Sequence, residues 1–300
     1  MSLATDLSLA PLPVSPEDFE TIISTFAREK RSTSVVTSMV AAVNHFHRLF
    51  GFPPPAQHPR VQLTLKGIQR AYSRPAEQTL PLSPSMIQAA IHLLGTDLYR
   101  TTNFSVSVLR WRTVAAMAFS FSSLARYSCM TRLKLHHITF YEDGLMVTFP
   151  SSKTDQLRQG KPVFVSRIRG SPFCPVMLMK AYTLRLQFEA FKGHAFPFLG
   201  FLFPAIRQQR EVSTLQNKAF SPQAALKAFR ELLEEIGLSN PKSFSLHSGR
   251  RGGATAAAMN GCDFLSIKRQ GRWKSDTCPQ LYIDEAHMRK NNFSMYLGLM

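Results

Sequence analysis

Acidic residues are scarce in this chain, and their scarcity sets the first constraint on its function. Only 19 Asp and Glu stand against 36 Lys and Arg, so the 300 residues carry a formal net charge of +17 at pH 7. Such an excess attracts polyanions, which makes nucleic acid the leading partner. Charge alone does not separate a DNA-acting protein from a ribosome-like RNA binder or from a protein with a merely basic surface.

Cysteines and long apolar runs are also few. The cysteines show no C-x-x-C spacing, so the sequence indicates neither a zinc site nor a disulfide framework. No apolar run approaches the roughly 18–20 residues that span a bilayer, and no signal peptide is visible. We expect a soluble intracellular protein without a membrane partner, cytoplasmic in a prokaryote or virus and nuclear in a eukaryote. Its free thiols would be Cys129, Cys174, Cys262 and Cys278.

The N-terminal third of the chain has the pattern of a small helical bundle. Ser15-Pro16 is typical of a helix start, and further helices are expected at Ser34–Phe50 and Val61–Tyr72. The stretch Ser73–Ser83 contains prolines and little apolar periodicity. It therefore predicts a domain boundary, with residues 1–78 on one side and 79–300 on the other.

The remainder predicts a mainly α fold with a small antiparallel β-sheet, an α+β domain. The letters ITFYEDGLMVTF at 138–149 are typical of a hairpin, with Gly144 able to take positive φ, and PVFVS at 162–166 can add a third strand. Helices are expected after Ser83-Pro84 and at Leu109–Leu124, Pro175–Phe188 and Ser221–Ile236.

The most informative stretch covers residues 244–283. His247 and Arg250 are three residues apart, so both project from one face at the start of a helix, where backbone N–H groups favour a phosphate. Gly252 and Gly253 would let another helix or a DNA backbone come close. The helix should stop at Asn260-Gly261, and Asp263 should cap a shorter one that ends near Gly271.

This stretch resembles the tyrosine recombinases, the family of phage integrases and Cre-type enzymes. Their catalytic pattern is an Arg, a Lys in a β-turn, His-x-x-Arg, a His or Trp, and the nucleophilic Tyr. HSGR supplies His247 and Arg250, GRW supplies Trp273, and QLYI supplies Tyr282. The steps of 26 residues from His247 to Trp273 and of nine to Tyr282 suit the family.

The resemblance implies two upstream members and extends over roughly Leu80 to Tyr282. SSLARYSCMTRLKLHHITF, an apolar helix end that leads into a hairpin, makes Arg126 the first arginine. FPSSKTDQ places Lys153 between the second and third strands. Two guanidiniums grip phosphate oxygens bidentately, and the tyrosine hydroxyl attacks phosphorus. The resemblance makes Lys153 the general acid. His247 would hydrogen-bond a phosphate oxygen or accept the tyrosine proton, and Trp273 would donate a hydrogen bond from its indole N–H while its ring packs against the site.

The family further implies a site-specific recombinase or integrase of a mobile element that forms a covalent 3′-phosphotyrosine. Residues 1–78 would be a helical core DNA-binding domain, and 79–300 the catalytic domain with a C-terminal tail. The partners would be double-stranded DNA and further copies of the chain, as a tetramer assembled on DNA. No cofactor, metal or small-molecule substrate is implied.

Several alternatives stay open. Each residue alone has an ordinary structural explanation, and the joint pattern carries the prediction. Cys129 stands where many relatives have an acidic residue that supports the first arginine, so a catalytically idle DNA-binding protein on the same fold is one rival. A type IB topoisomerase is another. Arg251 and Tyr296 are alternatives to Arg250 and Tyr282, although spacing favours the latter. The apolar tail would dock on a neighbouring subunit or on its own domain.

Overall fold

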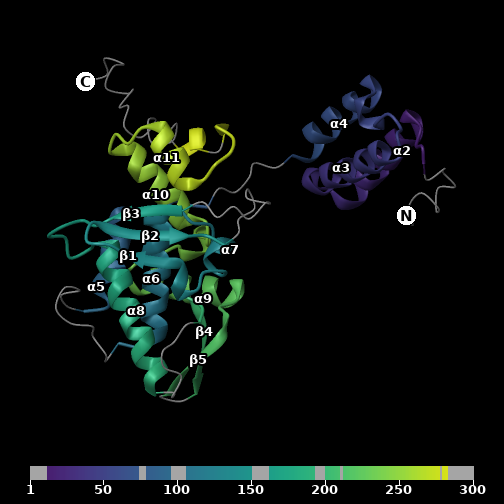
Figure 1. The fold of residues 1–300 in the computed structure, drawn as a ribbon. Helices are drawn as coiled ribbons and strands as arrows, with labels where there is room; N and C mark the ends of the chain where they lie inside the picture. Colours follow the sequence, from purple (N-terminus) through teal and green to yellow (C-terminus); the bar gives the residue numbers. More distant parts are fainter. Residues whose placement is uncertain are drawn as a thin grey trace. The chain divides into compact units, whose positions relative to one another are not determined.

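The chain divides into two compact units, Met1–Gln78 and Thr79–Met300. The computed structural model describes residues 12–73, 79–95, 106–150, 162–192, 200–209, 212–277 and 279–282 (Figure 1). Lys153, Tyr296 and the tail beyond residue 282 lie outside these residues. Among the described residues, no helix is long and apolar enough to cross a membrane.

The first unit is built from α-helices and one short 3₁₀ turn. The Ser15 side chain accepts a hydrogen bond from the Asp18 backbone N–H at 3.0 Å, as an N-cap residue does. The buried His47 side chain links α3 to the segment before α2. Its Nδ1–H donates to the Val43 carbonyl, and its Nε2 accepts from the Val14 N–H. The elements are α2 (Pro16–Lys30), α3 (Thr33–Leu49), η1 (Pro55–Gln57) and α4 (Pro59–Tyr72).

The second unit is mainly helical with two small antiparallel sheets. The first sheet has the order β1-β2-β3 and the second pairs β4 with β5. Its helices are α5 (Pro84–His92), α6 (Val108–Ser123), α7 (Tyr127–Met130), α8 (Pro175–Lys192), α9 (Pro222–Glu235), α10 (Ser248–Met259) and α11 (Phe264–Gly271), with η2 (Leu135–His137) and η3 (Pro241–Ser243). Its strands are β1 (Ile138–Phe140), β2 (Gly144–Thr148), β3 (Pro162–Ser166), β4 (Pro204–Gln209) and β5 (Val212–Ala219).

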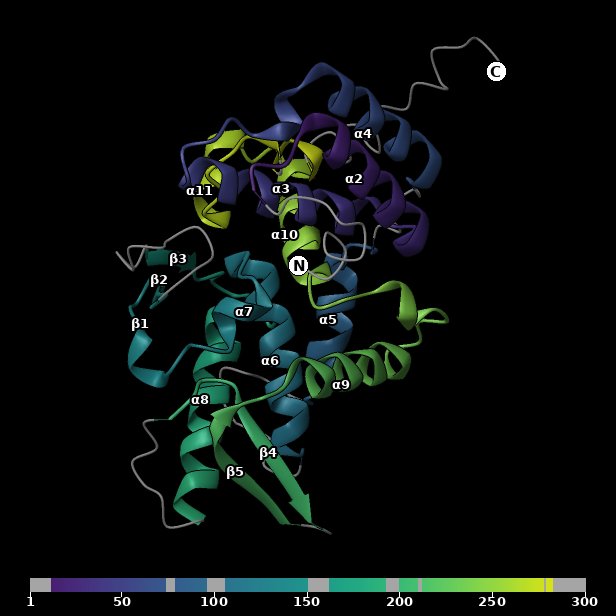
Figure 2. The ribbon, with the colours of Figure 1, turned by 90° about the vertical axis from the view of Figure 1, so that its right-hand side faces the viewer.

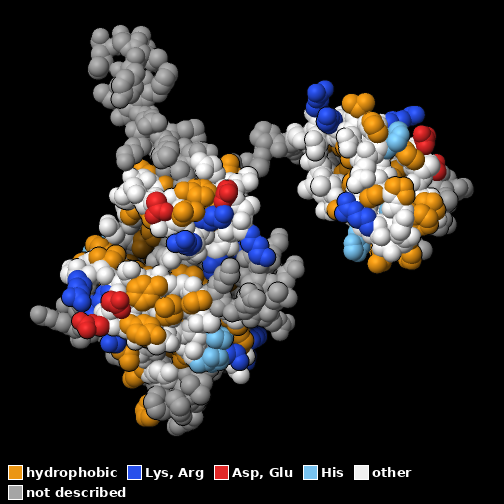
Figure 3. Space-filling view, turned by 45° about the horizontal axis from the view of Figure 1, so that its top comes forward, with side chains coloured by type: hydrophobic (Ala, Val, Ile, Leu, Met, Phe, Trp, Pro, Cys, Tyr) orange, Lys and Arg blue, Asp and Glu red, His pale blue; other side chains and the backbone are white. Residues whose placement is uncertain are grey.

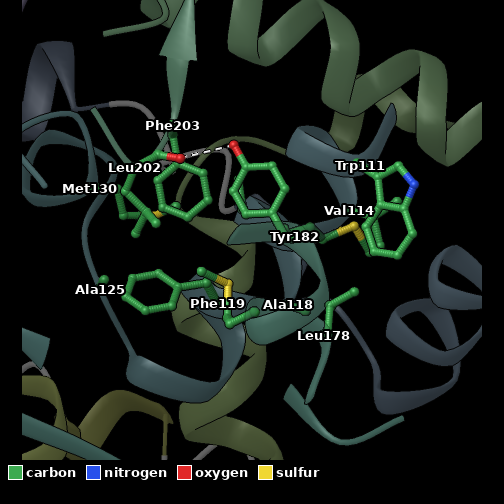
Figure 4. Close-up of a cluster of buried hydrophobic side chains, with 14 of the residues drawn as sticks. Trp111, Val114, Ala118, Phe119, Ala125, Met130, Leu178, Tyr182, Leu202 and Phe203 are labelled. Atoms are coloured by element: carbon green, nitrogen blue, oxygen red, sulfur yellow. Dashed lines mark hydrogen bonds between the residues drawn. The ribbon is translucent and has the colours of Figure 1, made fainter. Parts of the chain in front are cut away.

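Helix α6 is the centre of the second unit. It contacts α5, α8, α9 and α10, and these helices surround it in Figures 1 and 2. Its residue Trp111 is fully buried, and Phe119 packs against Phe203. Tyr182 of α8 stacks on Phe203 and donates its hydroxyl hydrogen to the Leu202 carbonyl at 2.9 Å (Figure 4). The buried phenol thus keeps a hydrogen-bond partner inside an apolar cluster.

The predicted three-stranded sheet is confirmed, and Gly144 lies in it without using the positive φ that is open to a glycine. It begins β2 opposite Ser166, and a Cβ there would overlap the Phe164 ring and the Val165 carbonyl oxygen. The glycine is required by the close approach of β3 and not by turn geometry.

The β4–β5 hairpin was not expected from the sequence. Its strands read PAIRQQ and VSTLQNKA, which are mostly polar and lack a clear alternation of apolar and polar residues. Pairing begins at Pro204↔Ala219, and the register shifts between Pro204 and Ala205. The helices expected from apolar periodicity are all present, with ends no more than four residues from those expected.

Three glycines let α10 approach its neighbours closely. A Cβ on Gly249 would overlap the Ser120 side chain, one on Gly252 the backbone of Leu82, and one on Gly253 the Phe121 carbonyl oxygen of α6. Leu82 is fixed in turn, because its N–H donates to the Ser248 carbonyl at 3.0 Å. Gly252 and Gly253, which were expected to allow close approach, and Gly249, which was not, therefore let α10 pack against α6 and the segment before α5.

We expect Gly252→Ala to lower the free energy of unfolding of the second unit by about 1–3 kcal/mol, because backbone atoms cannot move aside as a side chain can. Denaturant unfolding followed by circular dichroism measures the change. Unchanged stability would show that the Leu82 segment shifts freely.

Gly67→Ala in α4 should act in the opposite direction. A Cβ at Gly67 would meet no atom within 4 Å, so only the helix preference of alanine remains. We expect a gain of about 0.5–1 kcal/mol in the first unit, measured in the same way. A loss of stability would contradict this prediction, since the described structure shows no atom that a Cβ at Gly67 would crowd.

Candidate active site

The start of α10 places two of the predicted residues. His247 is the N-cap of α10 and is exposed, whereas Arg250 is only 3% exposed. The turn is held locally, because the Ser245 N–H donates to Ser248 Oγ and the His247 N–H donates to Ser245 Oγ. The two serines of FSLHS thus fix the helix start from which both side chains extend.

The Arg250 guanidinium joins the ends of two other helices. Its Nη1 donates to the Leu124 carbonyl, just after α6, and its Nη2 donates to the Gly271 carbonyl at 2.7 Å, at the last residue of α11. Carbonyls at helix C-termini lack partners within the helix and attract positive charge. Arg250 is therefore held rigidly, with two of its five N–H donors used by the protein.

Arg126 lies next to this junction, at the N-cap of α7. It is half-buried, and its Nη1 has no hydrogen-bond partner among the described residues. Burial lowers the pKa of Arg250 to about 9, and the positive charges of Arg126 and Arg272 act in the same direction. Arg250 still carries its charge at neutral pH. Guanidiniums that repel one another in a partly buried place favour binding of an anion.

The pKa of His247 is lowered from its ordinary value, first by desolvation and then by the positive charges of Arg250 and Arg126. Its neutral form therefore extends to lower pH than that of a free histidine. A neutral imidazole can accept a proton, which suits the role that the resemblance implies.

Trp273 and Tyr282 complete the cluster on the other side of Arg250. The Arg250 guanidinium carbon lies 3.9 Å from the centre of the Trp273 ring, and the Tyr282 ring lies 5.8 Å from Trp273 at 51°. Trp273 is 7% exposed and Tyr282 is half-buried. Tyr282 lies close enough to Arg250 for its ionised form to raise the pKa of that guanidinium.

Sequence reasoning missed Arg272 in this cluster. It is 8% exposed, and its guanidinium carbon lies 3.7 Å above the centre of the Phe149 ring. Its side chain also lies near Cys129, which raises the pKa of the guanidinium. The only signal in the sequence was a basic residue beside Trp273, and nothing there showed that the chain would turn it inward.

Five of the six predicted side chains therefore meet in the second unit: Arg126, His247, Arg250, Trp273 and Tyr282. Lys153 lies outside the described residues. No group of three or more His, Cys, Asp or Glu that could hold a metal occurs in the described part of the chain.

We expect Arg126→Gln to raise the pKa of His247, because one of the positive charges that disfavour imidazolium is removed. The pKa of His247 should lie below about 6.5 in the parent protein. NMR titration of the His247 ring, assigned with His247→Gln, measures both values. The control is Arg269→Gln, which removes an exposed charge that does not enter the causes of this shift. Equal midpoints in the parent and Arg126→Gln would contradict the arrangement.

No known protein-family model matches the chain. The chain is 26% identical to the curated "Integrase/recombinase xerD homolog" of Selenomonas ruminantium over 284 residues, which make up 94% of this chain and 76% of the relative.

Solved structures share the fold at 11–14% sequence identity. The XerH site-specific recombinase in a post-cleavage complex has a TM-score of 0.57, with 95% of this chain and 73% of that chain covered. The Tn1549 transposon integrase with transposon right end DNA has a TM-score of 0.57, with coverages of 94% and 87%. A lambda integrase dimer on a core site has a TM-score of 0.51, with coverages of 92% and 82%. The chain is thus similar in sequence to a curated integrase/recombinase homologue, and it shares the fold of solved recombinase and integrase structures.

Proposed function

We propose that this protein is a site-specific DNA recombinase or integrase that cleaves and rejoins DNA strands through a covalent 3′-phosphotyrosine on Tyr282. The observation that carries the proposal is the convergence of Tyr282, Trp273 and His247 on the Arg126–Arg250 pair, from segments more than 150 residues apart. The named activities of the related recombinases support it.

The arginines would bind the phosphate to be cleaved. Negative charge builds up on the non-bridging oxygens in the transition state, and guanidiniums already fixed in place stabilise it without rearranging. Arg250 is fixed by two carbonyls, and Arg126 offers a buried Nη1 that lacks a partner among the described residues. An incoming phosphate oxygen would supply that partner.

Tyr282 would attack the phosphorus, and the bond to the leaving 5′-oxygen would break. The covalent phosphotyrosine conserves the bond energy, so a second DNA 5′-hydroxyl can reverse the step. Neutral His247 would accept the tyrosine proton or hydrogen-bond a phosphate oxygen. Lys153 would protonate the leaving oxygen, as the resemblance implies. Trp273 would hold the Arg250 and Tyr282 side chains by packing.

DNA would bind mainly through the second unit. Residues 1–78 contain eight Lys and Arg and six Asp and Glu, so nearly all of the net charge of +17 belongs to residues 79–300. Lys and Arg side chains gather on the face of this unit that Figure 3 shows. The first unit would be a helical DNA-binding domain that adds contacts along the duplex. Four copies assembled on DNA would exchange the strands.

We expect the protein to form a covalent adduct with a nicked suicide DNA duplex carrying its target site, and Tyr282→Phe to form none, because the nucleophilic oxygen is gone. Denaturing gels measure the adduct, and filter binding measures DNA affinity, which should be unchanged. Tyr141→Phe, which alters an exposed tyrosine, is the matched control and should cleave like the parent.

The other results separate the rivals. If Tyr282→Phe still formed the adduct, the assignment of Tyr282 as the nucleophile would be wrong. Tight DNA binding without any adduct would identify a catalytically idle DNA-binding protein. Relaxation of supercoiled plasmids that lack the target site would favour a topoisomerase.

A further inference from the structure

Arg272 occupies a backbone position that an arginine does not favour. It follows the last residue of α11 in the left-handed conformation, with φ 55° and ψ 42°, which glycine adopts most easily. Its N–H donates to the Arg269 carbonyl and the Trp273 N–H to the Lys268 carbonyl. The turn itself needs no side chain, so the arginine indicates a use for the guanidinium.

The guanidinium is buried among segments that carry other members of the site. Phe149, which it covers, directly follows β2. Cys129, which lies near the guanidinium, is one turn after Arg126, and the Cys129 N–H donates to the Arg126 carbonyl at 2.9 Å. The next residue along the chain is Trp273. Arg272 is thus enclosed beside the Arg126–Arg250 pair and does not extend into solvent.

Burial makes the charge of Arg272 unfavourable in the absence of a ligand. It lowers the pKa of Arg272 from the ordinary value; Arg126 acts in the same direction, and Cys129 opposes the shift only in part. Arg272 in turn lowers the pKa of Arg250. Burying a guanidinium beside two others costs stability unless an anion balances them. Cys129, which lies near both Arg250 and Arg272, is a small thiol, where a carboxylate would have cancelled one charge.

We propose that Arg272 supplies a third positive charge to the phosphate-binding cluster of Arg126 and Arg250, acting through its electric field from beneath the site and not by contact with the reacting atoms. The role of Arg272 in DNA cleavage rests on the proposed function. Its role in binding a tetrahedral anion does not, and can be tested without DNA cleavage.

The test compares Arg272→Gln and Arg272→Lys with Arg269→Gln, which removes an exposed charge three residues away on the same helix. Thermal melting with and without inorganic phosphate, at constant ionic strength and without DNA, reports anion binding. The rate of adduct formation at saturating suicide DNA reports cleavage. We expect Arg272→Gln to lose at least half of the phosphate-induced rise in melting temperature and to cleave about tenfold or more slowly, a barrier change of about 1.4 kcal/mol. Arg272→Lys and Arg269→Gln should retain both.

A phosphate response and cleavage rate in Arg272→Gln equal to those in Arg269→Gln would overturn the inference. So would a lysine variant that loses both, since the shape of the guanidinium would then matter and not its charge. If Arg272→Gln does not fold, the lysine variant decides alone. A parent protein that responds to phosphate through Arg272 but forms no adduct would refute the proposed function and leave this inference standing, whereas a parent that does not respond would overturn the inference.

Discussion

The buried guanidinium of Arg250 is the interaction on which the candidate site depends. It donates to a carbonyl at the C-terminal end of α6 and to one at that of α11, and its flat face covers Trp273. The segment after α6 leads to Arg126, and the segment after α11 carries Arg272, Trp273 and Tyr282. The Arg250 side chain therefore sets the spacing between the two segments that would surround a phosphate. A lysine has no planar fork of N–H groups and could not bind both carbonyls in this way.

Close packing brings that guanidinium to its partners. Gly249, Gly252 and Gly253 remove side chains where α10 meets α6 and the segment before α5. Without this approach, Arg250 would not reach Leu124 and Gly271. The atoms that crowd these glycines belong to the protein itself, which is why their substitution should affect folding before chemistry.

The electrostatics of the site oppose the stability of the unliganded fold. Three arginines lie within electrostatic range of one another, and burial lowers the pKa values of Arg250 and Arg272. Desolvation, together with the charges of Arg250 and Arg126, keeps His247 neutral to lower pH. A phosphate would relieve the repulsion, so binding and preorganisation have one physical origin. The fold holds the arginines in place for a phosphate before the phosphate binds.

The sequence by itself determined the helices, the first sheet and the order of the candidate residues. Periodicity and caps such as Ser15 act over a few residues, so they can be read locally. The β4–β5 hairpin could not be predicted from the sequence, because its polar strands show no apolar alternation and form by pairing with each other. Only the tertiary structure decided that Arg272 turns inward onto Phe149 and Cys129, that Gly144 serves β3 and that Arg250 binds two helix ends. These contacts join residues far apart in the chain, and no local pattern encodes the distance between them.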